Sequence, residues 1–506
     1  MLLEWINVLV WGMPTLVLIL GTGFVLSVCT GFAQLRLFPK AVRTFAGQLK
    51  GQNSNNGISS FQALCTALAA TVGTGNLVGV AGAICLGGPG SIFWMWVCGF
   101  VGMMTKFAEA TLSVRYRIRE GVQIRCGPMY MIRMGLSRQW QFLAPVYAFL
   151  GVFAAFGVGN ATQINAVIAG AEQLAAFFGC TFSNEGKLVL GFLLAALVGS
   201  MLLGGAGCIA NAAELLVPFV SCVYLLLCVG ALAARAEAIP AAVRSIVCGA
   251  FSPRAATGGL VGSFFQTLRI GVSRGVFTNE AGMGTAALAH GGADVKHPVQ
   301  QGLMGIMEVF LDTIVICTMT ALVILTSGVP VPYGIDAGAD LTMDAFRAVC
   351  GEWVVVFLAL AMCCFAFATV LGWGLYGARC AEFLFGSKSW KVFALAQAAM
   401  VVFGAVLKTG TIWTLAEIMN GLMAIPNLIA LFSLRREVRR MTLDFTTKCG
   451  ACAVGGTYEN FDQCKPLSAL SHAEIPPLRA GSYPAGQKDL SSEHRPARSS
   501  HPSGLL

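Results

Sequence analysis

Two glycine-rich stretches interrupt the apolar part of this sequence, and hydroxyl, amide and charged side chains stand inside them. The first is Val72-Gly-Thr-Gly-Asn76, and the second runs from Gly271 to Gly284. Glycine weakens a helix because it loses the most backbone entropy on folding, so each stretch predicts a broken helix. At membrane depth the exposed N–H and C=O groups of a break need a partner from protein, water, an ion or a ligand. The expected chemistry is therefore binding by backbone groups.

The direction of a broken helix determines which groups it binds. The half-helix that ends near Val72 leaves carbonyl oxygens, which suit a hard cation such as sodium. The half-helix that begins at Gly75 and Asn76 offers N–H groups, which suit a carboxylate. The second stretch repeats the arrangement in the inverted direction, so carbonyls of residues 275–278 suit an ammonium group. A zwitterion fits between two such breaks.

Hydroxyl groups near the breaks add oxygen ligands without adding formal charge. The candidates are Thr71 and Thr74 in the first stretch, Thr278 in the second, and Thr369 in a later apolar run. Most threonines in membrane helices bond back to their own helix, so the threonines beside a break are the better candidates for an ion.

Charged residues inside the apolar runs have two interpretations that the sequence leaves open. A charge at the centre of a bilayer costs about 2.5 to 3.5 kcal/mol on the milder scale, so these residues face the protein interior. We expect Arg274 and Glu280 to form a structural ion pair rather than to bind a ligand. Glu109, Glu308 and Asp312 are either structural or act as proton carriers and gate elements.

The elements that position these residues are membrane helices. Hydrophobic residues make up 56% of the 506 residues and charged residues 11%, against about 25% charged residues in soluble domains. A spanning helix needs about 20 mostly apolar residues. Eleven such runs lie near 8–31, 60–86, 91–113, 141–178, 187–204, 211–234, 257–289, 299–326, 353–384, 389–408 and 411–434. The sequence therefore predicts an all-α integral membrane protein with 11 transmembrane helices.

The net charge of +9 does not indicate nucleic-acid binding, because the basic residues gather at alternate ends of the apolar runs. This distribution is the positive-inside pattern of membrane proteins. The main clusters lie in 36–50, 115–138 and 435–440. With eleven spans, the pattern predicts a multi-pass protein of the cell membrane whose N-terminus lies outside and whose C-terminus is cytoplasmic.

The ten runs that follow the first one divide into two halves. Residues 60–235 and 257–436 hold five runs each, and an odd number of runs orients the halves oppositely in the membrane. Five plus five inverted repeats are a transporter architecture. The linker 236–256 is expected to form an interfacial helix. The sequence thus predicts an extra N-terminal helix and cytoplasmic loop in 1–50, a ten-helix core in 51–436, and a cytoplasmic tail in 437–506 that we expect to be disordered.

Several motifs resemble, in the right order, those of the alanine/glycine:cation symporter family, also called the sodium:alanine symporter family, of the amino acid-polyamine-cation superfamily. They include Leu68-Ala-Ala-Thr-Val-Gly-Thr-Gly-Asn-Leu-Val-Gly79, Gly87-Gly-Pro-Gly90, Gly275-Val-Phe-Thr-Asn-Glu-Ala-Gly-Met-Gly284, His297-Pro-Val-Gln-Gln-Gly302 and Gly372-Trp-Gly-Leu-Tyr-Gly377. The resemblance covers about residues 55 to 435. It implies a leucine-transporter-like fold with broken first and sixth core helices.

The resemblance also implies a function and a set of site residues. It implies a sodium- or proton-coupled symporter that imports a small neutral amino acid, alanine or glycine, by alternating access. Position by position, the substrate contacts would be Thr74, Gly75, Asn76, Gln163, Phe277, Thr278, Asn279, Thr369 and Trp373. The sodium ion would bind the backbone carbonyls of Ala69 and Val72 and the hydroxyl of Thr369.

The identity of the coupling ion stays open, whereas an enzyme or a sensor is a weaker alternative to a transporter. Ala368 stands where the family usually has a serine, which removes one hydroxyl and leaves a proton as the alternative coupling ion. An enzyme would need a nucleophile and base or a metal cluster at membrane depth, whereas all five histidines lie at or beyond the ends of apolar runs. A solute sensor would need a folded output domain. We therefore expect a transporter without a cofactor, whose partners are an amino acid, sodium and lipid; the sequence indicates no oligomeric state.

Overall fold

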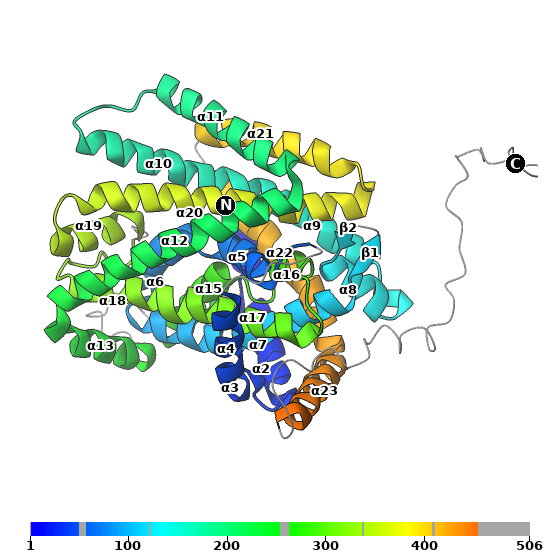
Figure 1. Cartoon of the computed structure of the whole chain (residues 1–506). Coiled ribbons are helices and arrows are strands. Elements are labelled where there is room, and N and C mark those ends of the chain that lie inside the picture. The colour runs from blue at the N-terminus through cyan, green and yellow to red at the C-terminus, as the bar shows by residue number, and fades with distance from the viewer. Residues whose placement is uncertain are drawn as a thin grey trace, which may run out of the picture. The chain divides into compact units, whose positions relative to one another are not determined.

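The computed structural model describes residues 2–49, 57–120, 123–252, 263–335, 338–406 and 410–453. This part of the chain is almost entirely helical, and residues up to Ala451 form one compact unit (Figure 1). The one sheet within the described residues is an antiparallel pair, β1 (Ile118–Glu120) and β2 (Gln123–Arg125), in which Ile118 faces Arg125.

The helices of the first half follow the order of the apolar runs. They are α1 (Leu2–Val10), α2 (Met13–Cys29), α3 (Ala33–Arg36), α4 (Phe38–Gln48), α5 (Ser60–Thr71), α6 (Val80–Gly87), α7 (Gly90–Arg115), α8 (Pro128–Gly135), α9 (Leu143–Phe156), α10 (Thr162–Phe177), α11 (Asn184–Leu203) and α12 (Gly205–Ala234). Two π-helical segments, η1 (Gly75–Gly79) and η3 (Gly157–Ala161), precede α6 and α10.

The second half begins after a short helix in the linker between the halves. Its helices are α13 (Ile239–Phe251), α15 (Phe264–Asn279), α16 (Thr285–His290), α17 (Pro298–Val309), α18 (Thr318–Thr326), α19 (Gly338–Cys350), α20 (Val354–Phe385), α21 (Ser389–Val406), α22 (Gly410–Ser433) and α23 (Arg435–Ala453). A third π-helical segment, η5 (Phe310–Cys317), joins α17 to α18. π-Helical turns are rare and occur often at functional sites.

Eight helical segments of the described chain are long and apolar enough to cross a membrane, or up to ten if each of two bent helix pairs counts as one span. These segments overlap ten of the predicted apolar runs. The remaining run, 257–289, contains α15 and α16, which have 16 and 6 residues. Neither helix is long enough to span a bilayer by itself.

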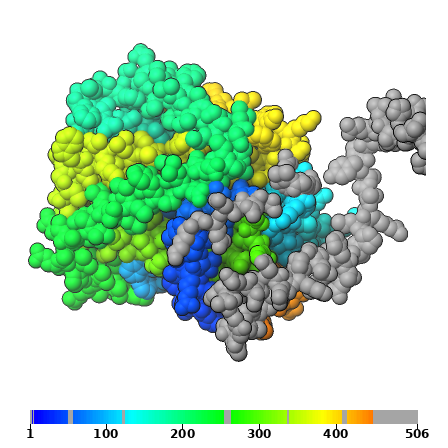
Figure 2. Space-filling view, viewed as in Figure 1, coloured from blue at the N-terminus to red at the C-terminus, as the bar shows by residue number. Residues whose placement is uncertain are grey.

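The packing of the helices brings segments from both halves together. Helix α7 packs against α15 and α17, α10 packs against α20, and α11 lies beside α21 (Figure 1). Helices α11 and α12 lie at the surface, in green in Figure 2. Large apolar side chains of these two helices are exposed, among them Phe192, Leu193, Leu215, Phe219 and Leu226. Such a surface suits contact with lipid rather than with water.

The linker between the two predicted halves and the segment that follows the second half are both helical. The linker 236–256 contains the turn η4 (Ala236–Ala238) and α13, so a helix lies where the sequence predicted one. The expectation of a disordered tail from residue 437 is wrong for its first part, because α23 continues to Ala453 and buries Val438, Met441 and Phe445. This spacing gives the helix an apolar stripe, which a search for long apolar runs does not detect. Residues 454–506 lie outside the described residues.

Candidate functional site

The first glycine-rich stretch is a sharp bend between two helical arms. Helix α5 starts with a capping box, in which Ser59 Oγ accepts from the Gln62 N–H at 3.0 Å and Gln62 Oε1 accepts from the Ser59 N–H at 2.9 Å. The helix ends at Thr71 because Val72 is extended, with φ −78° and ψ 102°. The chain then continues through η1 and α6, and the two arms are bent by 53°. We call residues 72–74 the first break.

Four of the predicted site residues pair across this bend. Thr74 Oγ1 lies 3.3 Å from Gln163 Oε1, which joins the first break to α10. Thr369 Oγ1 lies 3.0 Å from the Ala69 carbonyl oxygen, which joins α20 to the last turn of α5. Val72, the third residue predicted to bind the cation, is also buried. The predicted substrate and cation ligands therefore lie on the same bend.

The end of α15 faces the first break. A Cβ atom added to Gly75 would lie 3.3 Å from Thr278 Cγ2 and 3.7 Å from Phe277 Cδ1. The Thr278 hydroxyl donates to the Gly275 carbonyl of its own helix at 2.9 Å. The approach brings the two glycine-rich stretches into contact through residues that are far apart in the sequence.

Two asparagines predicted to contact substrate use their side chains within the protein. Asn76 Oδ1 accepts from the Gly73 N–H at 2.9 Å, and its Nδ2 donates to Asp312 Oδ1 at 2.7 Å. Asn279 Nδ2 donates to Thr313 Oγ1 at 3.1 Å. Because Asp312 and Thr313 both lie on η5, these amides fasten both breaks to the same π-helical segment.

The second interruption lies at the C-terminal end of the predicted stretch. Glu280, Gly282 and Gly284 have φ angles of 53°, 96° and 81°, which end α15 and precede α16. Glycine adopts this left-handed region at little cost. We call residues 280–284 the second break.

The earlier glycines of that stretch are helical instead. A Cβ atom at Gly275 would lie 3.1 Å from Cys98 Cβ, and one at Gly271 would collide with the Ser91 backbone. Their role is to allow close packing of α15 on α7. Sequence alone does not separate glycines that bend a helix from glycines that let two helices approach.

Trp373 lies against the second break. Its Nε1 donates to Glu280 Oε1 at 3.0 Å, and its side chain is 1% exposed. Gly159 of η3 provides the space for the indole, because a Cβ there would collide with Trp373 Cβ and Cγ. Glu280 thus bonds to Trp373, whereas Arg274, its expected ion-pair partner, lines a separate hollow of about 160 Å³ together with Glu417.

Glu109 of α7 holds the backbone of the second break. Its Oε1 accepts from the N–H groups of Gly282 and Gly284, both at 3.0 Å, and from Asn427 Nδ2 at 2.7 Å. Asn427 Nδ2 also donates to the Gly282 carbonyl at 2.9 Å. This acid, whose role the sequence left open, therefore links α7 and α22 to the break.

A buried chain of polar groups below the second break includes a lysine that sequence reasoning missed. Lys106 Nζ lies 2.8 Å from Glu308 Oε1, and both side chains are at most 1% exposed. Glu308 Oε2 lies 2.9 Å from His290 Nε2, and Gln301 Nε2 lies 2.6 Å from His290 Nδ1. Gln301 Oε1 then accepts from the Ser60 hydroxyl at 2.6 Å. A lysine inside an apolar run was the available signal, since such a charge requires a partner.

The start of α5 is also fastened to the loop that follows α16. Ile58 forms an isolated parallel bridge with Ala293, and the Asp294 N–H donates to the Ile58 carbonyl at 2.9 Å. Arg117 Nη1 donates to the Gly291 carbonyl at 3.2 Å. Burial, with a smaller effect of Arg119, lowers the pKa of Arg117 to about 10, so its guanidinium stays charged at neutral pH.

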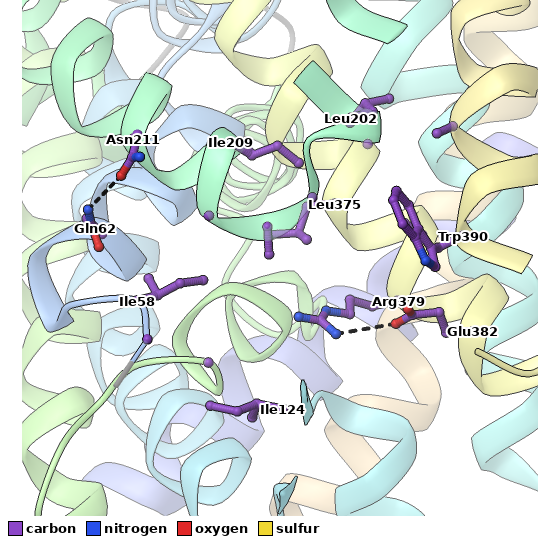
Figure 3. Close-up of a pocket in the computed structure, with 18 residues that line it drawn as sticks. Ile58, Gln62, Ile124, Leu202, Ile209, Asn211, Leu375, Arg379, Glu382 and Trp390 are labelled. Carbon is purple, nitrogen blue, oxygen red and sulfur yellow. Dashed lines mark hydrogen bonds and ion pairs between the residues drawn. The ribbon is translucent and has the colours of Figure 1, made fainter. Parts of the chain in front are cut away.

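A larger hollow opens beside the start of α5 (Figure 3). Its volume is about 520 Å³, and it is lined by the first turns of α5 and α12, the last turns of α20 and the start of α21. At its rim Gln62 Nε2 donates to Asn211 Oδ1 at 2.9 Å, and Arg379 pairs with Glu382 at 3.3 Å (Figure 3). The hollow also reaches Gly374 and Leu375, the residues next to Trp373.

The fold and the sequence both have relatives among known proteins. The crystal structure of MhsT in complex with L-phenylalanine has a TM-score of 0.52 and 15% identity, covering 78% of this chain and 99% of that chain. This likeness shows a shared fold.

Curated relatives match most of the chain. It is 41% identical over 449 residues to the sodium/alanine symporter AgcS of Methanococcus maripaludis, covering 88% of this chain and 96% of AgcS. It is 37% identical over 430 residues to the amino-acid carrier protein AlsT of Bacillus subtilis, covering 85% and 88%. The family model for sodium:alanine symporters matches residues 1–453. The chain therefore belongs to the sodium:alanine symporter family.

Proposed function

We propose that this protein is a secondary active symporter that imports alanine or glycine together with sodium by alternating access. Membership of the family supports amino acid symport. The proposal of a small zwitterionic substrate rests on the approach of Gly75 to Thr278. This approach places the start of η1 opposite the end of α15. The substrate carboxylate would lie at the N–H groups of residues 74–76, and its ammonium group at the last carbonyls of α15.

Two aromatic side chains would favour a small substrate. Phe277 lies close to Gly75. Trp373 packs against Gly159, bonds to Glu280, and lies one helical turn after Thr369, which contacts the first break. Both aromatic rings are bulky, and the contacts of Trp373 with Gly159 and Glu280 fix its position. A substrate with a long side chain would therefore clash with these rings, whereas one whose side chain is a hydrogen atom or a methyl group would not.

The coupling ion would bind between α5 and α20. Carbonyl and hydroxyl oxygens are ligands that a hard cation accepts. Thr369 Oγ1 and the Ala69 carbonyl lie 3.0 Å apart, and Val72 ends the same helical turn. Sodium would take both oxygens in place of the hydrogen bond that now joins them.

The two hollows would be the two routes to the site. With the N-terminus outside, the hollow at Gln62 and Arg379 would open to the cytoplasm. The hollow at Arg274 and Glu417 would open to the outside, and Phe277 lines it. Phe277 and Trp373 would then stand on opposite sides of the substrate, as gates for alternating access.

Uptake of labelled alanine into proteoliposomes tests this function. We expect an inward sodium gradient to drive accumulation, and an equal potassium gradient to serve as the inactive control. A proton gradient is imposed in a separate arm at equal sodium on both sides. Uptake driven only by the proton gradient would replace sodium by a proton, and uptake indifferent to both gradients would refute coupled symport.

A further inference from the structure

Five buried oxygen atoms around the second break make no well-formed hydrogen bond within the described chain. They are Glu109 Oε2, Glu280 Oε2, Thr285 Oγ1, Asn427 Oδ1 and Tyr376 Oη, and the five residues are at most 3% exposed. The Thr285 hydroxyl interacts with the Glu280 carboxylate, so these two groups belong to one cluster. Buried polar side-chain atoms are nearly always bonded. Five exceptions in one region, two of them carboxylate oxygens, therefore indicate a ligand that these atoms would share.

The groups that carry these atoms are connected to one another. Glu109 bonds to Gly282, Gly284 and Asn427 through its other oxygen. Glu280 belongs to the same five-residue break and bonds to Trp373, whose ring centroid lies 5.7 Å from that of Tyr376. The five oxygens thus belong to α7, α16, α20, α22 and the second break, which meet around one loop.

Ionised carboxylates in this region would leave negative charge uncompensated. Lys106 interacts electrostatically with Glu109, Glu280 and Glu308, but its ammonium group is bonded to Glu308 at 2.8 Å. Glu308 also hydrogen-bonds to His290 at 2.9 Å. A buried carboxylate without a nearby positive charge costs several kcal/mol even after the surroundings relax. Glu109 and Glu280 therefore need either bound protons or a further cation.

We propose that the second break holds a binding site for a sodium-sized monovalent cation. Its ligands are the carboxylates of Glu109 and Glu280, with the Tyr376 hydroxyl and the Asn427 side-chain oxygen completing an all-oxygen set, as hard cations require. A divalent ion fits less well, because Lys106 already places one positive charge near both carboxylates. This site is separate from the one expected at Ala69, Val72 and Thr369.

The proposed ion would connect the second break to α20 and α22. Glu280 belongs to the break, Asn427 donates to the Gly282 carbonyl, and Tyr376 lies one helical turn after Trp373 on α20. Binding would therefore fix the position of Trp373, the side chain proposed above to limit the size of the substrate. The existence of the site does not depend on the proposed transport, since ion binding can be measured without any amino acid.

Equilibrium binding of radioactive sodium to the purified full-length protein, without alanine, tests the site. We expect Glu280→Gln and Glu109→Gln each to lose a sodium ion that Thr369→Val retains. Glutamine keeps a side-chain oxygen for the existing hydrogen bonds but removes the charge. Glu172→Gln is the matched control, because Glu172 forms a partly exposed ion pair with Lys187, with side-chain exposures of 44% and 25%.

Tyr376→Phe keeps the test decisive if the carboxylate variants fail to fold. Its hydroxyl has no bonded partner among the described residues, so we expect the unfolding temperature in sodium-free choline buffer to match the wild type. Sodium affinity should fall by about tenfold, equivalent to about 1.4 kcal/mol. Unchanged sodium affinity in all three variants would overturn the proposal. Altered proton uptake with unchanged sodium binding would also overturn it, because the carboxyls would then carry protons.

Discussion

Thr369 Oγ1 lies 3.0 Å from the carbonyl oxygen of Ala69 and equally 3.0 Å from that of Phe365. One hydroxyl has a single proton, so it can donate a full hydrogen bond to only one of these carbonyls at a time. The bond to Ala69 ties α20 to α5, and the bond to Phe365 lies within α20. A cation at this position would replace the first bond and leave the second intact.

Removal of the Thr369 hydroxyl should weaken the response to sodium. For Thr369→Val we expect the sodium concentration at half-maximal alanine uptake to rise by about tenfold or more, which corresponds to about 1.4 kcal/mol. Thr369→Ser should behave like the wild type. Thr66→Val is the control, because the buried Thr66 hydroxyl donates to the Gln62 carbonyl of its own helix at 2.7 Å, away from the break. Equal effects of Thr369→Val and Thr66→Val would exclude Thr369 as an ion ligand.

A large side chain at Gly75 should block the substrate site. Gly75→Leu would fill the space beside Thr278, where even a Cβ atom comes within 3.3 Å of Cγ2. We expect alanine binding, measured by calorimetry on the purified protein, to disappear while the fold is kept. Gly79→Ala is the control, since a Cβ atom there would meet no other heavy atom within 4 Å among the described residues. Normal alanine affinity in Gly75→Leu would show that the substrate binds elsewhere.

Shortening Trp373 should broaden the range of substrates. Trp373→Ala removes a buried indole, so amino acids with larger side chains, such as leucine, should compete with labelled alanine. Trp373→Phe keeps an aromatic ring but loses the bond to Glu280 Oε1. We expect this variant to keep the preference for small substrates. If both variants discriminate as the wild type does, Trp373 does not set the size of the pocket.

The buried Lys106 and Glu308 pair should matter for stability as a unit. Removal of one partner of a buried pair costs about 3 to 5 kcal/mol, because the other charge is left uncompensated. Lys106→Met and Glu308→Gln should therefore each lower the unfolding temperature strongly, and the double variant should lose less than the sum of the two. The test is a thermal unfolding cycle on all four proteins, in which additive effects would contradict a coupled pair.

The first break was predictable because the signal is local. Gly73 and Gly75 stand within four residues of the end of α5, and the capping box at Ser59 and Gln62 marks its start. Thr74 and Gln163 were each expected at the substrate site only from the family resemblance, because two residues separated by 89 positions share no periodic signal.

The polar network around the second break was less accessible to sequence reasoning. Lys106 and Glu308 are separated by 202 positions in the sequence, and Glu109 and Asn427 are separated by 318. Such partners are selected by tertiary packing, which hydrophobic periodicity does not encode. The position of the second break depends on which glycines take positive φ angles. Sequence alone does not distinguish Gly282, which has a positive φ angle, from Gly275, which allows α15 to pack closely on α7.

Glu280 is a non-glycine residue with a φ angle of 53°. An L-residue in this left-handed conformation loses roughly 1 to 2 kcal/mol, which glycine would avoid. Glu280→Gly would thus relax the backbone and delete the carboxylate in a single step. A variant library selected only for thermal stability should accordingly enrich glycine at this position, whereas one selected for sodium-dependent growth on alanine should keep glutamate. Opposite outcomes of the two selections at one codon would reveal a residue whose conformation the protein maintains at the expense of its stability.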